Sequence, residues 1–87
     1  MRIKNMLTVQ TDYSIYADVV EISIRKMRDS AIYYDIVFVR NGSDKVYTLT
    51  SGHSLDKCQG FLNRIRKYIR DNQPMVITKC FLDGSIL

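Results

Sequence analysis

The apolar residues of positions 54–71 recur at spacings of three and four residues, which is the pattern of an amphipathic helix. Ser54 suits the N-cap, and Asp56 lies where the helix dipole favours negative charge. Pro74 cannot continue the backbone hydrogen bonding, so the helix is expected to end before it. The residues expected on the buried face are Leu55, Cys58, Phe61, Leu62, Ile65, Tyr68 and Ile69.

Residues with strand propensity lie on both sides of this helix. Residues 32–40 and 46–50 are rich in β-branched and aromatic side chains. Turn-forming residues connect them, and Gly42 can take a positive φ there, so the two segments predict a hairpin. Further strands are predicted at residues 75–82, followed by a turn at 83–84, and at residues 2–9.

Two periods compete in residues 12–28. Residues 20–25 alternate between apolar and polar side chains, as a strand does. Val19 is out of phase with Val20, so a strand here requires a β-bulge near that point. In a helix, by contrast, acidic and basic side chains four positions apart would pair.

The choice between these two interpretations decides the predicted topology. The strand predicts an α+β fold with a largely antiparallel sheet, built from a β-meander, one amphipathic helix and a C-terminal strand. The helix predicts the ferredoxin-like order β-α-β-β-α-β instead. We favour the meander because propensity and alternation agree within the segment.

A single helix covers only one face of such a sheet. We expect Ile22, Ile24, Ile36 and Phe38 to point towards it. The opposite face then carries large apolar and aromatic side chains among polar ones, which is unusual for a surface exposed to water. A partner protein or a second copy of the chain could cover this face, and the residues expected at that interface are Tyr33, Val37, Val39 and Val46.

Length and composition predict one folded domain spanning residues 1–87. The chain is 46% hydrophobic and 25% charged, which is typical of globular proteins and argues against disorder. No apolar run approaches the roughly 20 residues of a membrane span, and the first residues do not resemble a secretory signal. We therefore expect a cytoplasmic protein with no membrane association, whose two cysteines are reduced.

The net charge of +4 permits contact with nucleic acid or with acidic protein surfaces. Tyrosines supply possible stacking surfaces for unpaired bases. Against this, Glu21 and Asp35 are expected on the same face as Tyr33, where they would repel a phosphate backbone. The residues expected to bind nucleic acid or an acidic partner are Lys57, Arg64, Arg66, Lys67 and Arg70 on the helix, with Arg25 and Arg28 as a second basic cluster.

Catalytic and metal-binding patterns are weak. His53, Ser54 and Asp56 are close in sequence, but neighbouring positions at a helix start rarely form a catalytic relay. Cys58 and Cys80, with the single histidine, provide only three zinc-type ligands, and their spacing matches no finger pattern. We therefore expect no enzymatic activity, no metal and no cofactor.

The sequence thus favours a small accessory protein that acts by binding another protein, as an inhibitor or adaptor of a larger complex. Small accessory proteins of phages and mobile elements often act in this way. The alternative is nucleic-acid binding through the basic face of the helix. Homodimerisation through the sheet face would use the same residues as a protein partner.

Overall fold

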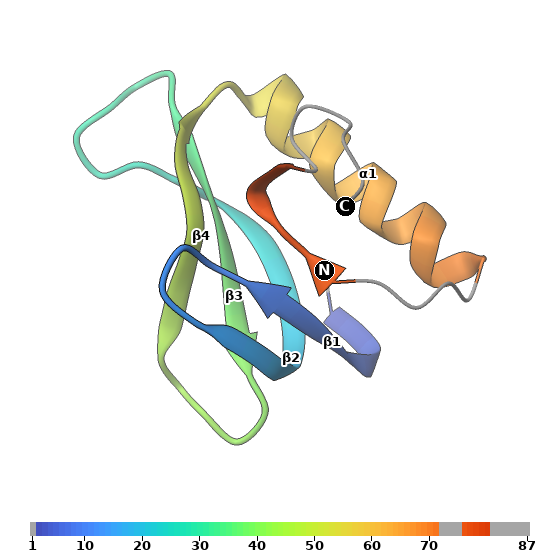
Figure 1. Cartoon of the computed structure of the whole chain (residues 1–87). Coiled ribbons are helices and arrows are strands. Elements are labelled where there is room, and N and C mark those ends of the chain that lie inside the picture. The colour runs from blue at the N-terminus through green and yellow to red at the C-terminus, as the bar shows by residue number, and fades with distance from the viewer. Residues whose placement is uncertain (1, 72–75, 81–87) are drawn as a thin grey trace.

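The structure is a computed structural model that describes residues 2–71 and 76–80. Four strands follow one another before the helix, and a short strand follows it (Figure 1). The elements are β1 (Arg2–Gln10), β2 (Ile15–Lys26), β3 (Tyr34–Arg40), β4 (Val46–His53), α1 (Leu55–Arg70) and β5 (Val76–Ile77). The five strands form one sheet in the order β4-β3-β2-β1-β5.

The first four strands pair antiparallel with their neighbours, and β5 pairs parallel with β1. The predicted α+β meander is therefore confirmed. The helical alternative for residues 12–28 is wrong, because residues 15–26 form β2. The β-branched residues of this segment favour the extended backbone, and strands on both sides complete its hydrogen bonding.

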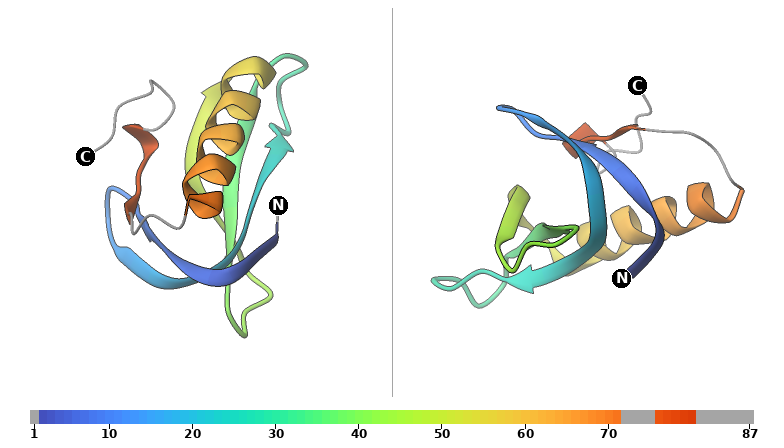
Figure 2. Two further views of the ribbon diagram at one scale, coloured as in Figure 1. Left: turned by 90° about the vertical axis from the view of Figure 1, so that its right-hand side faces the viewer. Right: turned by 90° about the horizontal axis from the view of Figure 1, so that it is seen from below.

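A β-bulge in β2 resolves the phase conflict around Val20. Val19 pairs with Arg40, and Glu21 pairs with Val39, so β2 uses one more residue than β3 over this interval. The extra residue lets Val19 and Ile22 both lie fully buried although they are three positions apart. The register of β1 against β2 is irregular as well. Figure 2 shows the curved sheet that results.

The helix lies against the concave face of this sheet (Figure 2). The expected residues Ile22, Ile36 and Phe38 are buried in the core, and Ile24 packs partly buried against it. Helix residues Cys58, Phe61, Leu62 and Ile65 complete the core from the other side. Burial of this apolar surface is what holds the helix against the sheet.

The ends of α1 follow the sequence prediction. The Ser54 hydroxyl accepts a hydrogen bond from the Lys57 backbone N–H at 3.3 Å, which is the N-cap interaction. Asp71 is the C-cap, and its N–H donates to the Lys67 carbonyl oxygen at 2.9 Å. Among the described residues, no helix is long and apolar enough to cross a membrane.

Two glycines in the β3–β4 hairpin have a positive φ. Gly42 has φ +74° in the connecting turn, as predicted. Gly52 has φ +81° within β4, where Tyr34 pairs with His53 and Ile36 pairs with Thr50. Over that interval β4 has one residue more than β3, so Gly52 lies in a bulge of β4.

The C-terminal strand is present but shorter than predicted. Within the described residues, β5 consists of Val76 and Ile77, and Lys79 and Cys80 form a short 3₁₀ turn after it. Thr78 is described and is not part of a strand, whereas residues 75, 81 and 82 of the predicted strand, and the predicted turn at 83–84, lie outside the described residues.

Candidate binding surfaces

Three aromatic rings from three neighbouring strands meet on the concave face of the sheet. Tyr16 of β2 lies 5.4 Å from Phe38 of β3 and 5.3 Å from Tyr47 of β4, measured between ring centroids. The Phe38 and Tyr47 rings stack at 5.3 Å with an interplanar angle of 13°. Such pairs stabilise beyond the area they bury, by about 0.5–1.5 kcal/mol each.

Arg40 holds this cluster from one side. Its guanidinium carbon lies 4.9 Å from the centroid of the Tyr16 ring and 5.9 Å from that of Tyr47. Its Nε donates to Asp18 Oδ1 at 2.9 Å, and this bond holds the pKa of Asp18 below its ordinary value and raises that of Arg40. Lys45 approaches the Tyr47 ring to 5.1 Å. Two cations thus lie beside the rings, and the ion pair with Asp18 positions one of them, Arg40.

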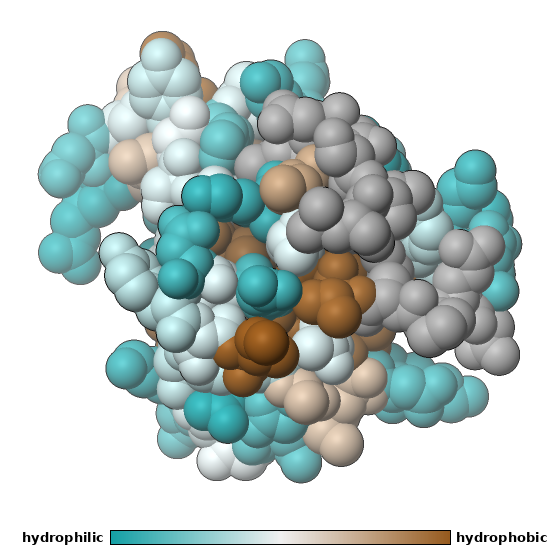
Figure 3. Space-filling view, viewed as in Figure 1, coloured by the Kyte–Doolittle hydropathy of each residue, from teal (hydrophilic) through white to brown (hydrophobic). Residues whose placement is uncertain are grey.

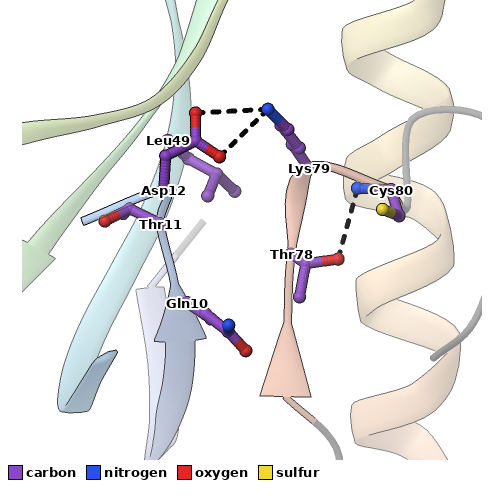
Figure 4. A pocket seen from close by; sticks show the side chains of 7 residues that line it. All are labelled: Gln10, Thr11, Asp12, Leu49, Thr78, Lys79 and Cys80. Carbon is purple, nitrogen blue, oxygen red and sulfur yellow. Dashed lines mark hydrogen bonds and ion pairs between the residues drawn. The ribbon is translucent and has the colours of Figure 1, made fainter. Parts of the chain in front are cut away.

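Two adjoining cavities lie beside the aromatic cluster. The first measures about 230 Å³ and is lined mainly by Tyr13, Tyr16, Phe38, Tyr47 and Leu49. The second measures about 160 Å³ and extends from Leu49 to the segment after β5 (Figure 4). Both are lined by Thr11, Asp12 and Leu49, so they adjoin one another, and we call the two cavities together the tyrosine groove.

An ion pair crosses the second cavity. Lys79 Nζ lies 3.0 and 3.2 Å from the two carboxylate oxygens of Asp12, as Figure 4 shows. The hydrogen bond to Asp12 raises the pKa of Lys79. Because Asp12 belongs to the β1–β2 turn and Lys79 follows β5, this contact joins the two sides of the groove. Figure 3 shows hydrophobic side chains gathered on this side of the molecule with hydrophilic ones around them.

The face of the sheet that was expected to be an interface offers less apolar surface than the sequence suggests. Val37 is only 4% exposed, and Val39 is half-buried. Val46 is 44% exposed, and Tyr33 is 46% exposed but lies in the loop before β3. Val37 alternates with core residues and so points away from the helix, yet neighbouring side chains cover it. A partner could touch Tyr33 and Val46 here, but not Val37.

The basic residues fall into two groups. Lys57, Arg66, Lys67 and Arg70 are exposed on α1, whereas Arg64 is half-buried. Arg66 donates to the Asn63 side chain at 3.1 Å, and Arg70 lies 3.7 Å from the Asp71 carboxylate. Arg25 and Arg28, with Lys26, line a separate cavity at the end of β2.

The residues considered for catalysis and metal binding are placed apart or already engaged. The His53 Nε2 and Thr50 Oγ1 atoms lie 2.7 Å apart, while the Ser54 hydroxyl caps the helix. Burial raises the pKa of the Cys58 thiol, and the charge of Asp35 raises it further. In the part of the chain that the structure describes, no three His, Cys, Asp or Glu side chains form a group that could hold a metal ion.

Sequence reasoning missed the tyrosine groove. The alternation of each strand indicates which residues share a face, but not which residues of neighbouring strands lie side by side. Tyr16, Phe38 and Tyr47 come together only through the paired registers of β2, β3 and β4. The chain matches no protein-family model, and it matches no curated protein and no solved structure.

Proposed function

We propose that this protein is a non-enzymatic accessory protein of the cytoplasm that binds another protein through the tyrosine groove, as an adaptor or inhibitor of a larger complex. The observation that carries this proposal is the concave groove lined by three tyrosines and a phenylalanine, with the Tyr13 side chain 97% exposed at its edge. An aromatic side chain left this exposed on a small protein is available to a partner.

The chemistry of the groove suits a protein partner. Tyrosine is enriched where interfaces concentrate their binding energy, because it presents a large rigid surface with few rotatable bonds. The contacts of Arg40 with Asp18 and with two of the rings hold the groove in one arrangement before binding. Lys45 adds a cation beside the rings. We therefore expect a partner that places an apolar or aromatic side chain in the groove and an acidic residue near Lys45.

The experiment begins with identification of a binding partner and purification of both proteins, followed by calorimetric titration. Tyr13→Ala removes an exposed ring and leaves the core intact, so a fall in affinity of about tenfold or more is expected if the groove is the interface. Ile32→Ala is the matched control, because Ile32 is also exposed but does not line the groove. Sedimentation of the protein alone measures homodimerisation.

The outcomes distinguish an error in the location of the interface from an error in the proposed protein binding. Loss of affinity in Val46→Asp and Tyr33→Ala, with none in Tyr13→Ala, would keep protein binding and move the interface to the other sheet face. A direct titration in which no purified partner binds would overturn the proposal.

Nucleic-acid binding through α1 is the second candidate function. The observation that favours it is the series of exposed cations Lys57, Arg66, Lys67 and Arg70, which have one acidic neighbour within the helix, Asp56. Each phosphate that such a cation neutralises releases counterions, so binding should weaken steeply with salt. Fluorescence anisotropy against single-stranded and duplex oligonucleotides at two salt concentrations tests this. A variant with all four cations changed to glutamine should not bind, whereas a lack of wild-type binding even at low salt excludes this candidate.

A further inference from the structure

The turn between β3 and β4 holds an asparagine that is followed directly by a glycine. Asn41 and Gly42 are both exposed, and Figure 1 shows this turn projecting from one end of the sheet. The Ser43 N–H donates to the Arg40 carbonyl oxygen at 3.2 Å, and this bond closes a β-turn around the two residues. The asparagine and the glycine are therefore its two central residues, and water reaches both.

The side chain of Asn41 and the backbone nitrogen of Gly42 are uncovered. The Asn41 N–H donates to the Asp18 carbonyl oxygen at 2.8 Å, which holds the start of the turn against β2. The Asn41 side-chain amide and the Gly42 N–H, by contrast, have no hydrogen-bond partner among the described residues. Chain neighbours apart, no described atom lies within 4 Å of the position that a Cβ on Gly42 would take. No bond or contact of the described residues therefore keeps the side-chain amide away from the nitrogen that follows it.

An asparagine side chain in this position can react with its own backbone. The nitrogen of the next residue loses its proton to hydroxide and attacks the side-chain carbon Cγ, which closes a five-membered ring. The bond from Cγ to the amide nitrogen breaks, and that nitrogen takes a proton from water and leaves as ammonia. Water then opens the ring at Cγ, which gives aspartate, or at the backbone carbonyl carbon, which gives isoaspartate. In sum, one amide and one water become one carboxylic acid and one ammonia.

The other asparagines of the described residues are placed less well for this reaction. Asn63 is exposed on α1, but its side-chain oxygen accepts from Arg66 at 3.1 Å, and the backbone N–H groups of a helix interior are hydrogen-bonded. Asn5 lies in β1 and is followed by Met6, whose side chain crowds the nitrogen. A glycine has no side chain, so the nitrogen after Asn41 is the most accessible of the three.

We infer that Asn41 is a self-modification site, which converts to aspartate and isoaspartate in the folded protein without an enzyme. The conversion lowers the net charge from +4 to +3, since one neutral amide becomes one carboxylate. Isoaspartate also adds one carbon atom to the backbone of the turn. The next paired residues are Val39 with Val46 and Phe38 with Tyr47, and their register depends on the length of this turn. The isoaspartate form should therefore be less stable than the aspartate form, which keeps the backbone length.

The test is incubation of the full chain in buffer at neutral and at mildly alkaline pH, with circular dichroism to show that the chain stays folded. Peptide mapping by mass spectrometry follows the amide of each asparagine, and a colorimetric assay counts the ammonia released. Asn41 should lose its amide faster than Asn5 and Asn63 by an order of magnitude or more. The rate should rise in proportion to the hydroxide concentration, because the attacking nitrogen must first lose its proton.

Three variants assign the reaction to this turn. Asn41→Ser removes the amide and keeps a residue that suits a turn, so the early release of ammonia should disappear. Asn63→Ser is the matched control, because it removes an exposed amide of the helix and should leave the release of ammonia unchanged. Asn41→Asp reproduces the aspartate product. Its urea midpoint should be close to that of fresh wild type, whereas an aged wild-type sample should contain a second species that unfolds at lower urea concentration.

Three results would overturn the inference. The first is loss of the amide of Asn5 or Asn63 before that of Asn41. The second is release of ammonia from Asn41→Ser as fast as from the wild type. The third is conversion of Asn41 in urea but not in buffer, since the folded turn would then protect the amide. Asn41 does not line the tyrosine groove, so Tyr13→Ala should leave the rate unchanged, and either proposal can fail alone.

Discussion

Replacing Val37 by aspartate tests whether the sheet face opposite the helix is covered or open. If this face were an open interface, Val37→Asp would leave folding intact and would abolish only partner binding. The structure instead places Val37 at 4% exposure in the centre of β3, beside Thr48 of β4 and Ser23 of β2. We therefore expect Val37→Asp to act on stability before it acts on any interaction.

The magnitude follows from burial. Full burial of a valine side chain contributes about 1.5–3 kcal/mol, and this contribution is lost. An unpaired carboxylate in the same position adds a penalty of several kcal/mol. Asp35 lies two residues away on the same strand and adds like-charge repulsion. The sum of about 5 kcal/mol or more is comparable with the total stability of a protein of this size, about 4–13 kcal/mol.

The assay is urea unfolding followed by circular dichroism, with two companion variants. Val37→Ala removes two methyl groups and should cost about 2 kcal/mol, which is small enough to measure. Val46→Asp is the matched control, because Val46 is 44% exposed on the neighbouring strand. It should change the free energy of unfolding by about 0.5 kcal/mol or less.

A stable Val37→Asp variant would refute this reasoning. If the aspartate variant unfolds at nearly the same urea concentration as the wild type, Val37 is exposed in solution. The sheet face would then return as the leading interface, and Val37→Asp would become a direct test of partner binding.

Three further expectations follow from the structure. Gly52→Ala should destabilise the fold by about 1–2 kcal/mol, because its φ of +81° strains a residue with a side chain. Gly60→Ala in the helix should stabilise it by about 0.5–1 kcal/mol, because the new Cβ has room. Changes of the same sign in the free energy of urea unfolding for both variants would contradict this. Asp18→Asn should destabilise at pH 7 and destabilise less as the pH falls, because the hydrogen bond from Arg40 lowers the folded-state pKa of Asp18. The stability from this lowered pKa is fully present above the unfolded-state value of about 3.9 and is lost as the pH falls through the folded-state pKa. A series of urea midpoints measured from pH 7 downward tests this expectation. Cys80 should react with a thiol reagent in the folded protein, whereas Cys58, which is buried and has a raised pKa, should react only after unfolding. Equal labelling rates for the two thiols would show that the helix is not packed against the sheet.

The helix could be predicted in detail because its signals are local. The Ser54 cap and the apolar stripe are properties of one segment. The cap appears as expected, and Cys58, Phe61, Leu62 and Ile65 of the stripe are buried, whereas Leu55 at the helix start is 38% exposed. The meander was also predictable, since alternation in residues 20–25 outweighed the competing helical period. The bulge near Val20 was required by the phase of its neighbours, and the register confirms it.

The candidate site was less predictable because it depends on contacts between distant segments. The alternation of β3 correctly predicts that Val37 lies on the outer face, but the burial of Val37 depends on the side chains of the adjacent strands. The Oδ1 atom of Asp35 is buried with no hydrogen-bond partner among the described residues, and this depends equally on everything packed around it. No local pattern encodes either property.

The order of residues alone is sufficient for the amphipathic helix, the strand segments, the Gly42 turn and the net positive charge, because each depends on neighbours along the chain. The pairing of strands decided the rest. The registers of β2, β3 and β4 bring three aromatic rings into one groove, and the bulges curve the sheet around the helix. Register and curvature are set by the packing of many residues at once, so only the folded chain shows which side chains share a surface.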